Sequence, residues 1–301
     1  MNPPRLPAGL WVALATPFDQ KGALDRAAFA RIVKYVVKGG VDTVVVLGST
    51  GEAATLHEDE RDVLIELALE HRGSARVVVG TGHNATDQAC RLTRRALDLG
   101  AHGALVVTPY YNRPTPAGIA AHFAAIAKTS DGLPLVAYNV PARTGSNLTP
   151  AALALLWELD AVVAVKESSG SLAQIDTVAR EMPAGKMLLA GDDPLALASI
   201  AVGAAGLVSV VANVLPAATR AWIDAALAGD RAAAIAWQAR LMPVIDALSL
   251  EPNPIALKAA LAHAGLSGAG CRLPLLPPSA ATRAAVAAAL DRSELLIANP
   301  R

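Results

Sequence analysis

The stretch that decides the fold runs from Ala161 to Glu181 and reads AVVAVKESSGSLAQIDTVARE. It opens with a continuous run of alanine and valine, which is typical of a strand buried on both faces of a parallel sheet. The small and polar residues that follow predict a turn, and Leu172–Glu181 has the apolar spacing of a helix. The stretch therefore predicts one strand, one turn and one helix, with Lys166 at the end of the strand.

The same unit recurs along the chain. Apolar runs predict eight strands, at Leu10–Phe18, Val41–Gly48, Arg76–Gly82, Gly103–Pro109, Leu133–Val140, Val162–Glu167, Lys186–Asp192 and Gly206–Asn213. Helical periodicity lies between most of them, at Asp25–Lys38, His57–His71, Thr86–Leu99, Pro116–Ser130, Thr149–Leu159 and Leu172–Glu181. The intervals between strands fit one helix and two turns.

These repeated units predict an α/β protein with the architecture of a (β/α)8 TIM barrel. Beyond the last strand the pattern is helical, over Ala217–Ala228, Arg231–Leu248, Pro254–Ala264 and Ala280–Leu290. Because a barrel needs only one helix after its last strand, the surplus predicts a C-terminal helical extension. We expect a barrel catalytic domain over residues 1–230 and the extension over residues 231–301.

The composition argues against several classes of protein. The 26 basic residues balance the 26 acidic ones, so no global field favours a nucleic acid or an anionic membrane as a partner. Hydrophobic residues make up 53% of the chain, which argues against disorder. The uncharged segment Pro194–Thr219 is long enough to span a bilayer, but Gly203 and Pro216 interrupt it, so we expect no membrane span. Two distant cysteines, Cys90 and Cys271, favour a reducing, cytoplasmic location.

Lys166 is the first candidate catalytic residue. It is the only one of the seven lysines that directly follows an apolar strand, and strand alternation places it on the face of Val162 and Ala164. On the inner face of a barrel, lost hydration lowers the pKa of a lysine and yields the neutral amine that Schiff-base chemistry needs. Barrel active sites lie at the carboxyl ends of strands, so we expect Lys166 to be the nucleophile. The alternative is a surface lysine at the end of a strand.

Hydroxyl groups follow the neighbouring strands. Tyr138 ends the fifth strand, and Tyr110 and Tyr111 follow the fourth. A phenol that hydrogen-bonds to a hydroxyl such as Ser49 can pass a proton, although these tyrosines could instead be core aromatics. The Gly-flanked turn of Ser49 and Thr50 suits a small carboxylate, with helix capping as the alternative.

Arg143 is presented on a tight turn between Pro141 and Gly145. A guanidinium there suits bidentate recognition of a carboxylate, and a solvated loop arginine is the alternative. Other kinds of site have weak support. Residues 80–85, GTGHNA, match a dinucleotide fingerprint, but no acidic residue ends the next strand. The turn at residues 48–51 lacks the lysine of a phosphate-binding loop, and the six histidines show no metal-ligand spacing, so we expect no metal site.

Together these motifs resemble the dihydrodipicolinate synthase family, which belongs to the pyruvate-dependent class I aldolases. The resemblance covers almost the whole chain and is carried by Gly48–Glu52, Thr108–Asn112, Tyr138–Pro141, Arg143–Gly145, Lys166–Glu167, Gly191–Asp193 and Glu251–Pro254. The lysine, the tyrosine and the turn mark the superfamily at large. The Arg-Thr-Gly after Tyr-Asn-Val-Pro is more specific, because in this family the arginine holds the carboxylate of the aldehyde substrate.

The resemblance implies a lyase with pyruvate and L-aspartate-4-semialdehyde as substrates. Lys166 would form the Schiff base, so no separate cofactor is implied. Tyr138 would be the acid/base residue, linked through Ser49 to a Tyr111 that arrives from a neighbouring subunit. The family therefore implies at least a dimer, usually within a homotetramer built as a dimer of dimers. Thr50 would bind the pyruvate carboxylate.

The resemblance also places Gly191 and the backbone carbonyl of Val208 along the pocket. Two departures concern the site: Ser49 stands where the family usually has threonine, and Ser168 where alanine is frequent. A sister Schiff-base aldolase acting on a sugar-derived 2-keto acid, of the N-acetylneuraminate lyase or 2-keto-3-deoxy sugar acid aldolase type, is the alternative, and Arg143 argues against it.

A possible effector site for L-lysine also follows from the resemblance. The chain keeps Ala54, Asn84 and Tyr110 of that site but has Glu58 and Arg61 where regulated members commonly carry histidines. It also has Gln88 where they carry a glutamate. A neutral amide replaces a carboxylate that would meet the lysine ammonium, so we expect weak feedback or none.

Overall fold

Eight strands form the centre of the protein, whose computed structural model describes residues 6–296 of the chain. They close into one barrel in which neighbours follow the order of the sequence, and the paired strands run parallel. The strands are β1 (Gly9–Ala13), β2 (Thr43–Val46), β3 (Arg76–Gly80), β4 (Gly103–Val107), β5 (Leu135–Asn139), β6 (Val162–Glu167), β7 (Met187–Ala190) and β8 (Gly206–Ser209).

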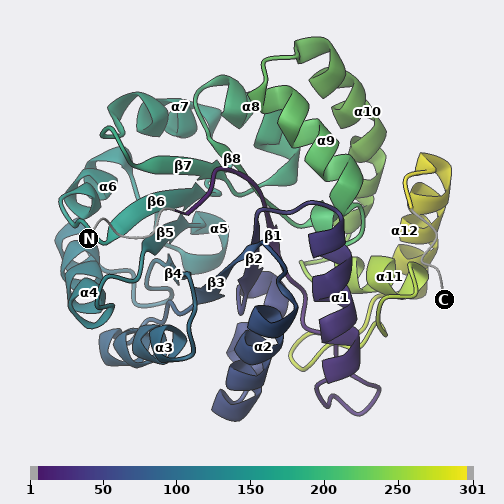
Figure 1. Cartoon of the computed structure of the whole chain (residues 1–301), viewed down its shortest axis with the longest axis horizontal. Helices are drawn as coiled ribbons and strands as arrows, with labels where there is room; N and C mark the ends of the chain where they lie inside the picture. Colours follow the sequence, from purple (N-terminus) through teal and green to yellow (C-terminus); the bar gives the residue numbers. More distant parts are fainter. Residues whose placement is uncertain (1–5, 297–301) are drawn as a thin grey trace. The chain divides into compact units, whose positions relative to one another are not determined.

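Helices alternate with the strands and continue after the last one (Figure 1). They are α1 (Arg26–Lys38), α2 (Glu58–His71), α3 (Thr86–Asp98), α4 (Pro116–Thr129), α5 (Pro141–Thr144), α6 (Pro150–Trp157), α7 (Leu172–Glu181), α8 (Ala196–Ala201), α9 (Pro216–Leu227), α10 (Arg231–Leu248), α11 (Ile255–His263) and α12 (Ala280–Ser293). This arrangement confirms the predicted (β/α)8 TIM barrel with additional C-terminal helices. Within residues 6–296, no helix is both long and apolar enough to cross a membrane.

The described chain divides into two compact units. The first comprises residues 6–8 and Arg76–Val208 and carries β3 to β7, nearly all of β8, and α3 to α8. The second comprises Gly9–Ala75 and residues 209–296 and carries β1, β2, α1, α2 and α9 to α12. The domain boundary that the sequence predicts after residue 230 stays a prediction.

Seven of the eight strands end earlier than the apolar pattern predicts, and the difference is largest at β1 and β8. β1 ends at Ala13 rather than at Phe18, and β8 ends at Ser209 rather than at Asn213. The Asn213 side chain accepts a hydrogen bond from the Ala15 amide at 3.1 Å and donates one to the Ala13 carbonyl at 2.8 Å. Because a side chain occupies these backbone groups, β1 ends although the apolar pattern continues.

Packing in the first unit determines which way the end of β6 faces. The apolar core of this unit contains Phe123 of α4, Trp157 of α6 and Val165 of β6. Val165 directly precedes Lys166, and successive strand residues point to opposite faces of a sheet. Lys166 and Ala164 therefore face away from this core. The prediction that Val162 shares their face is wrong: Val162 belongs to the core with Val165, because the pairing with β5 shifts register between Val162 and Ala164.

Candidate active site

The first unit brings two predicted catalytic residues together at the carboxyl ends of β5 and β6. Tyr138 and Lys166 are direct neighbours in the strand register. Lys166 Nζ lies over the Tyr138 ring, 4.2 Å from its centroid. Lys166 is 5% exposed and Tyr138 is 7% exposed, so the alternative of a surface lysine is wrong. The pair presents an amine against the ring of a phenol in a buried position.

A buried polar network fixes the backbone that immediately follows this pair. Asn139 Nδ2 donates to both carboxylate oxygens of Glu167, at 3.2 and 2.9 Å. The same carboxylate accepts from the Ser169 amide at 2.6 Å and from Gln174 Nε2 at 3.4 Å. The Asn139 amide cannot turn over without loss, because its Oδ1 accepts from the Leu148 amide at 2.8 Å. The network ties the ends of β5 and β6 to each other and to the start of α7.

Gly191 lies against the lysine from the neighbouring strand. Its amide donates to the Glu167 carbonyl at 2.8 Å, just beyond the end of β7. A methyl group on Gly191 would overlap Ser168 Oγ and would lie 3.0 Å from Lys166 Cε. Glycine at this position therefore avoids a steric clash with Ser168 and Lys166. Val208, the other predicted lining residue, is fully buried in β8.

Asp192 adds a carboxyl group near the lysine. Burial raises the pKa of Asp192, and the positive charge of Lys166 is the largest opposing influence. The Ser168 hydroxyl and the Arg143 guanidinium also lower this pKa. The first unit thus gathers an amine, a carboxyl group and a guanidinium close enough to influence one another.

Arg143 lies on the one-turn helix α5, which Gly145 ends in a left-handed conformation with φ of 71°. Its side chain is exposed, as expected of a group that receives a ligand from solvent. The loop after β4 lies against the end of this helix, because the Tyr111 amide donates to the Thr144 carbonyl at 3.2 Å. Tyr111 itself is 90% exposed and has φ of 73°, so the loop projects its phenol away from the chain. The Tyr110 ring instead packs edge-on against His83.

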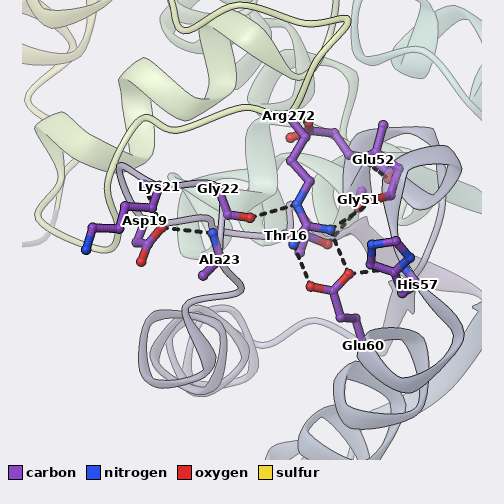
Figure 2. A network of polar contacts seen from close by, with 11 residues as sticks. Thr16, Asp19, Lys21, Gly22, Ala23, Gly51, Glu52, His57, Glu60 and Arg272 are labelled. Atoms are coloured by element: carbon purple, nitrogen blue, oxygen red, sulfur yellow. Dashed lines mark hydrogen bonds and ion pairs between the residues drawn. The ribbon is translucent and has the colours of Figure 1, made fainter.

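The second unit carries the predicted carboxylate-binding turn. Ser49 and Thr50 begin a short 3-10 helix after β2, with Ser49 exposed and Thr50 only 2% exposed. Thr50 Oγ1 accepts a hydrogen bond from Asn253 Nδ2 at 2.9 Å. The Gly51 carbonyl accepts from Thr16 Oγ1 at 2.7 Å (Figure 2). Side chains distant in the sequence therefore hold the turn at Thr50 and at Gly51.

The family is shown by direct comparison with known proteins. The model of the dihydrodipicolinate synthetase family matches residues 6–293, nearly the whole chain. The chain belongs to this family. The membership confirms the resemblance that the motifs carry.

Individual proteins similar to this chain support the same family membership. A protein of an Exiguobacterium species, named 4-hydroxy-tetrahydrodipicolinate synthase, is 44% identical over 285 residues, which cover 94% of this chain and 97% of the relative. The crystal structure of dihydrodipicolinate synthase from Thermotoga maritima has a TM-score of 0.93 and 37% identity, and covers 97% of this chain and 100% of that one. A solved monomeric dihydrodipicolinate synthase variant has the same TM-score and identity, and covers 97% of this chain and 98% of its own.

The residues of the possible effector site are distributed over both units. In the first unit, the Asn84 carbonyl accepts from Asn112 Nδ2 at 3.0 Å, and Gln88 Oε1 accepts from the Arg91 guanidinium on the next turn of α3. In the second unit, Ala54 and Glu58 are exposed around the start of α2. The amide of Gln88 is thus already engaged by a cation of its own helix.

Several polar residues that hold the candidate site residues within each unit were not predicted from the sequence. They are Asn139 in the first unit and Thr16, Asn253 and Lys258 in the second. Lys258 is fully buried and ion-pairs with Glu52, next to the turn of Thr50. Within residues 6–296, no group of three or more histidine, cysteine, aspartate or glutamate side chains could hold a metal ion.

Proposed function

We propose that the protein condenses pyruvate with L-aspartate-4-semialdehyde to form 4-hydroxy-tetrahydrodipicolinate, a step of lysine and diaminopimelate biosynthesis. The observation that carries the proposal is the buried amine of Lys166 over the Tyr138 ring at the carboxyl end of β6. The names of the relatives support the synthase over a sister aldolase that acts on sugar-derived keto acids. Arg143, exposed near Asp192 and Lys166, supports a second substrate that carries a carboxylate.

The reaction begins when Lys166 Nζ, after losing a proton, attacks C2 of pyruvate. Water leaves the resulting carbinolamine, and a protonated imine forms. The imine accepts the electrons of a methyl C–H bond, so the loss of one proton gives an enamine without a separate cofactor. The enamine carbon bonds to the aldehyde carbon, whose oxygen takes up a proton. The amine of the semialdehyde then attacks C2, closes the ring and releases Lys166.

The remaining residues bind the substrates and move protons. Tyr138 exchanges protons with the carbinolamine and the new hydroxyl, since its phenol lies beside the amine. Ser49 and Tyr111 extend this phenol into a relay. Thr50 binds the pyruvate carboxylate, and Arg143 binds that of the semialdehyde. Gly191 and the Val208 carbonyl line the pyruvate-binding site in this proposal.

Chemical trapping tests the nucleophile. Borohydride added with pyruvate is expected to reduce the imine and leave a stable pyruvyl group on Lys166 alone, which peptide mass spectrometry locates. Turnover should continue in EDTA. A label on another residue, or the loss of turnover on chelation, would refute the Schiff-base mechanism.

A homotetramer built from dimers is part of the proposal. The 90% exposure of Tyr111 supports it, because a relay phenol that points away from its own chain suits the site of a neighbour. Mixing inactive Lys166→Ala with inactive Tyr111→Phe chains tests this directly. Random exchange makes about half of the dimers mixed, and each mixed dimer contains one complete site out of two. About a quarter of wild-type activity should therefore return. No recovery after verified subunit exchange would show that Tyr111 acts within its own chain.

We also infer a cytoplasmic location. Cys90 and Cys271 are both free thiols. Burial raises the pKa of the Cys271 thiol to about 11, which leaves it protonated and slow to oxidise at neutral pH. Two unpaired thiols suit a reducing compartment.

A further inference from the structure

The C-terminal helices contain a buried lysine that the proposed reaction does not use. Lys258, in α11, has no exposed surface. Its Nζ lies 2.5 Å from Glu52 Oε1 and donates to the Thr16 carbonyl at 2.6 Å and to the Gly270 carbonyl at 2.8 Å. The ring of Phe18 covers another side of the ammonium, with its centroid at 4.5 Å. Three oxygens and an aromatic face therefore surround the ammonium group of Lys258.

Charge compensation keeps this lysine in place. Burial lowers the pKa of Lys258, and the carboxylate of Glu52 is the largest opposing influence. The neighbouring thiol of Cys271 is neutral at physiological pH, because burial raises its pKa to about 11. Glu52 is therefore the counterion on which the buried ammonium depends. Removing either partner alone would leave an uncompensated charge in a dry site.

Glu52 directly follows the Ser49–Gly51 turn. Its backbone is left-handed, with φ of 51°, and it is 5% exposed. Its other carboxylate oxygen accepts from the backbone amide of Arg272 at 3.1 Å. The Glu52 side chain thus joins Lys258 of α11 to the Arg272 amide in the segment after α11. Because Glu52 directly follows Gly51, these two contacts also constrain the backbone of the Ser49–Gly51 turn.

Other residues of the C-terminal segment contact the same stretch. Asn253 Nδ2 donates to Thr50 Oγ1 at 2.9 Å. The Arg272 guanidinium donates to the Thr55 carbonyl at 2.9 Å and to both carboxylate oxygens of Glu60, at 2.6 and 2.5 Å (Figure 2). Asn253, Lys258 and Arg272 therefore all contact residues 50–60, although Lys258 and Arg272 also donate to the carbonyls of Thr16 and Gly22.

We propose that Lys258 is a positioning residue: through its ion pair with Glu52 it holds the Ser49–Glu52 turn in the conformation that lets Thr50 bind the pyruvate carboxylate. The proposal rests on the proposed function for the role of Thr50. It assigns the C-terminal helical segment a part in substrate affinity, since a small displacement of a binding group is enough to weaken a site. Lys258 touches no substrate in this scheme and acts only through Glu52.

The test compares Lys258→Met with Lys34→Met, an exposed lysine of α1 in the same unit. Lys258→Met is expected to raise the KM for pyruvate about tenfold or more, with the KM for the aldehyde changed less than about twofold. Lys34→Met should leave both constants unchanged. Glu52→Gln keeps the shape of the carboxyl group and weakens the pair, so it should give the same pattern to a smaller degree and serves if Lys258→Met fails to fold.

Hydrogen–deuterium exchange supplies a readout that does not depend on the chemistry. In Lys258→Met, amides of residues 49–52 should exchange faster, while those of β6 keep their wild-type protection. A lower melting temperature with unchanged pyruvate KM and unchanged exchange in the turn would overturn the proposal, because it would show a purely structural role. Failure of the proposed function would give a different result: borohydride would trap pyruvate on the wild-type protein, but the protein would not consume the semialdehyde. The effect of Lys258→Met on pyruvate binding would still decide the role of Lys258. Wild-type protein that traps no pyruvate would refute both.

Discussion

The network behind the catalytic pair predicts a specific sensitivity to the substitution Glu167→Gln. The glutamate accepts four hydrogen bonds through two oxygens, from Asn139, Ser169 and Gln174. A glutamine carries an NH2 group in place of one oxygen. In one orientation this group faces the Ser169 amide, and in the other it faces the Asn139 and Gln174 side-chain amides. Every orientation therefore sets a donor against a donor.

The geometry bounds the size of the effect. A hydrogen bond to a charged acceptor contributes about 1.5–3 kcal/mol, and a buried donor left without an acceptor costs about 1–3 kcal/mol. Glu167 is only 1% exposed, so water gives little relief. We expect a loss of about 2–4 kcal/mol in the free energy of unfolding, which for a chain of this size lowers Tm by roughly 3–6 °C. Because Lys166 and Tyr138 directly precede the network, the rate of pyruvate trapping should fall between about 10- and 100-fold.

Calorimetry and single-turnover borohydride trapping measure the two effects. Glu181→Gln, the same substitution on an exposed residue of α7, is the matched control and should change neither quantity. Wild-type Tm and wild-type trapping in Glu167→Gln would refute the reasoning.

Three further outcomes are expected. Arg143→Ala should lower kcat/KM for the semialdehyde by roughly 10- to 150-fold, the scale of a lost charge-assisted pair of 1.5–3 kcal/mol, while pyruvate trapping persists; unchanged aldehyde kinetics would leave Arg143 without a role in the specificity. Because the pKa of Asp192 is raised, its ionised form opposes folding above that pKa, so Asp192→Asn should melt at a higher temperature than wild type at pH 8, and the difference should vanish in acid. A constant difference at every pH would contradict this. L-Lysine should inhibit only above about a millimolar, because the neutral Gln88 amide is engaged by Arg91 and offers no carboxylate to an ammonium; half-inhibition well below that in a steady-state titration would disprove it.

The predictable part of the site is the part that depends on local periodicity. Alternation along β6 predicts the side of Lys166, and the core position of Val165 agrees with it. Parallel β–α repeats predict that Tyr138 and Lys166 end neighbouring strands, and the register pairs them directly. The end of β1 was not predictable, because the Asn213 side chain that occupies the backbone groups of Ala13 and Ala15 lies about two hundred residues away along the chain. An apolar pattern predicts that a segment is buried, but it does not predict which groups hydrogen-bond to its backbone amides and carbonyls.

The two buried lysines show where this limit lies. Lys166 ends an apolar strand, so its neighbours follow from the strand order. Lys258 contacts Thr16 and Glu52 across more than two hundred residues, and no short-range spacing joins them. One local signal was nevertheless present: Ile255–His263 reads IALKAALAH, and a helix that is apolar on every side is buried on every side. A single lysine in such a helix has no solvent-facing position, so it must bring its own counterion into the interior, and the carboxylate that meets it belongs to the loop that holds Thr50.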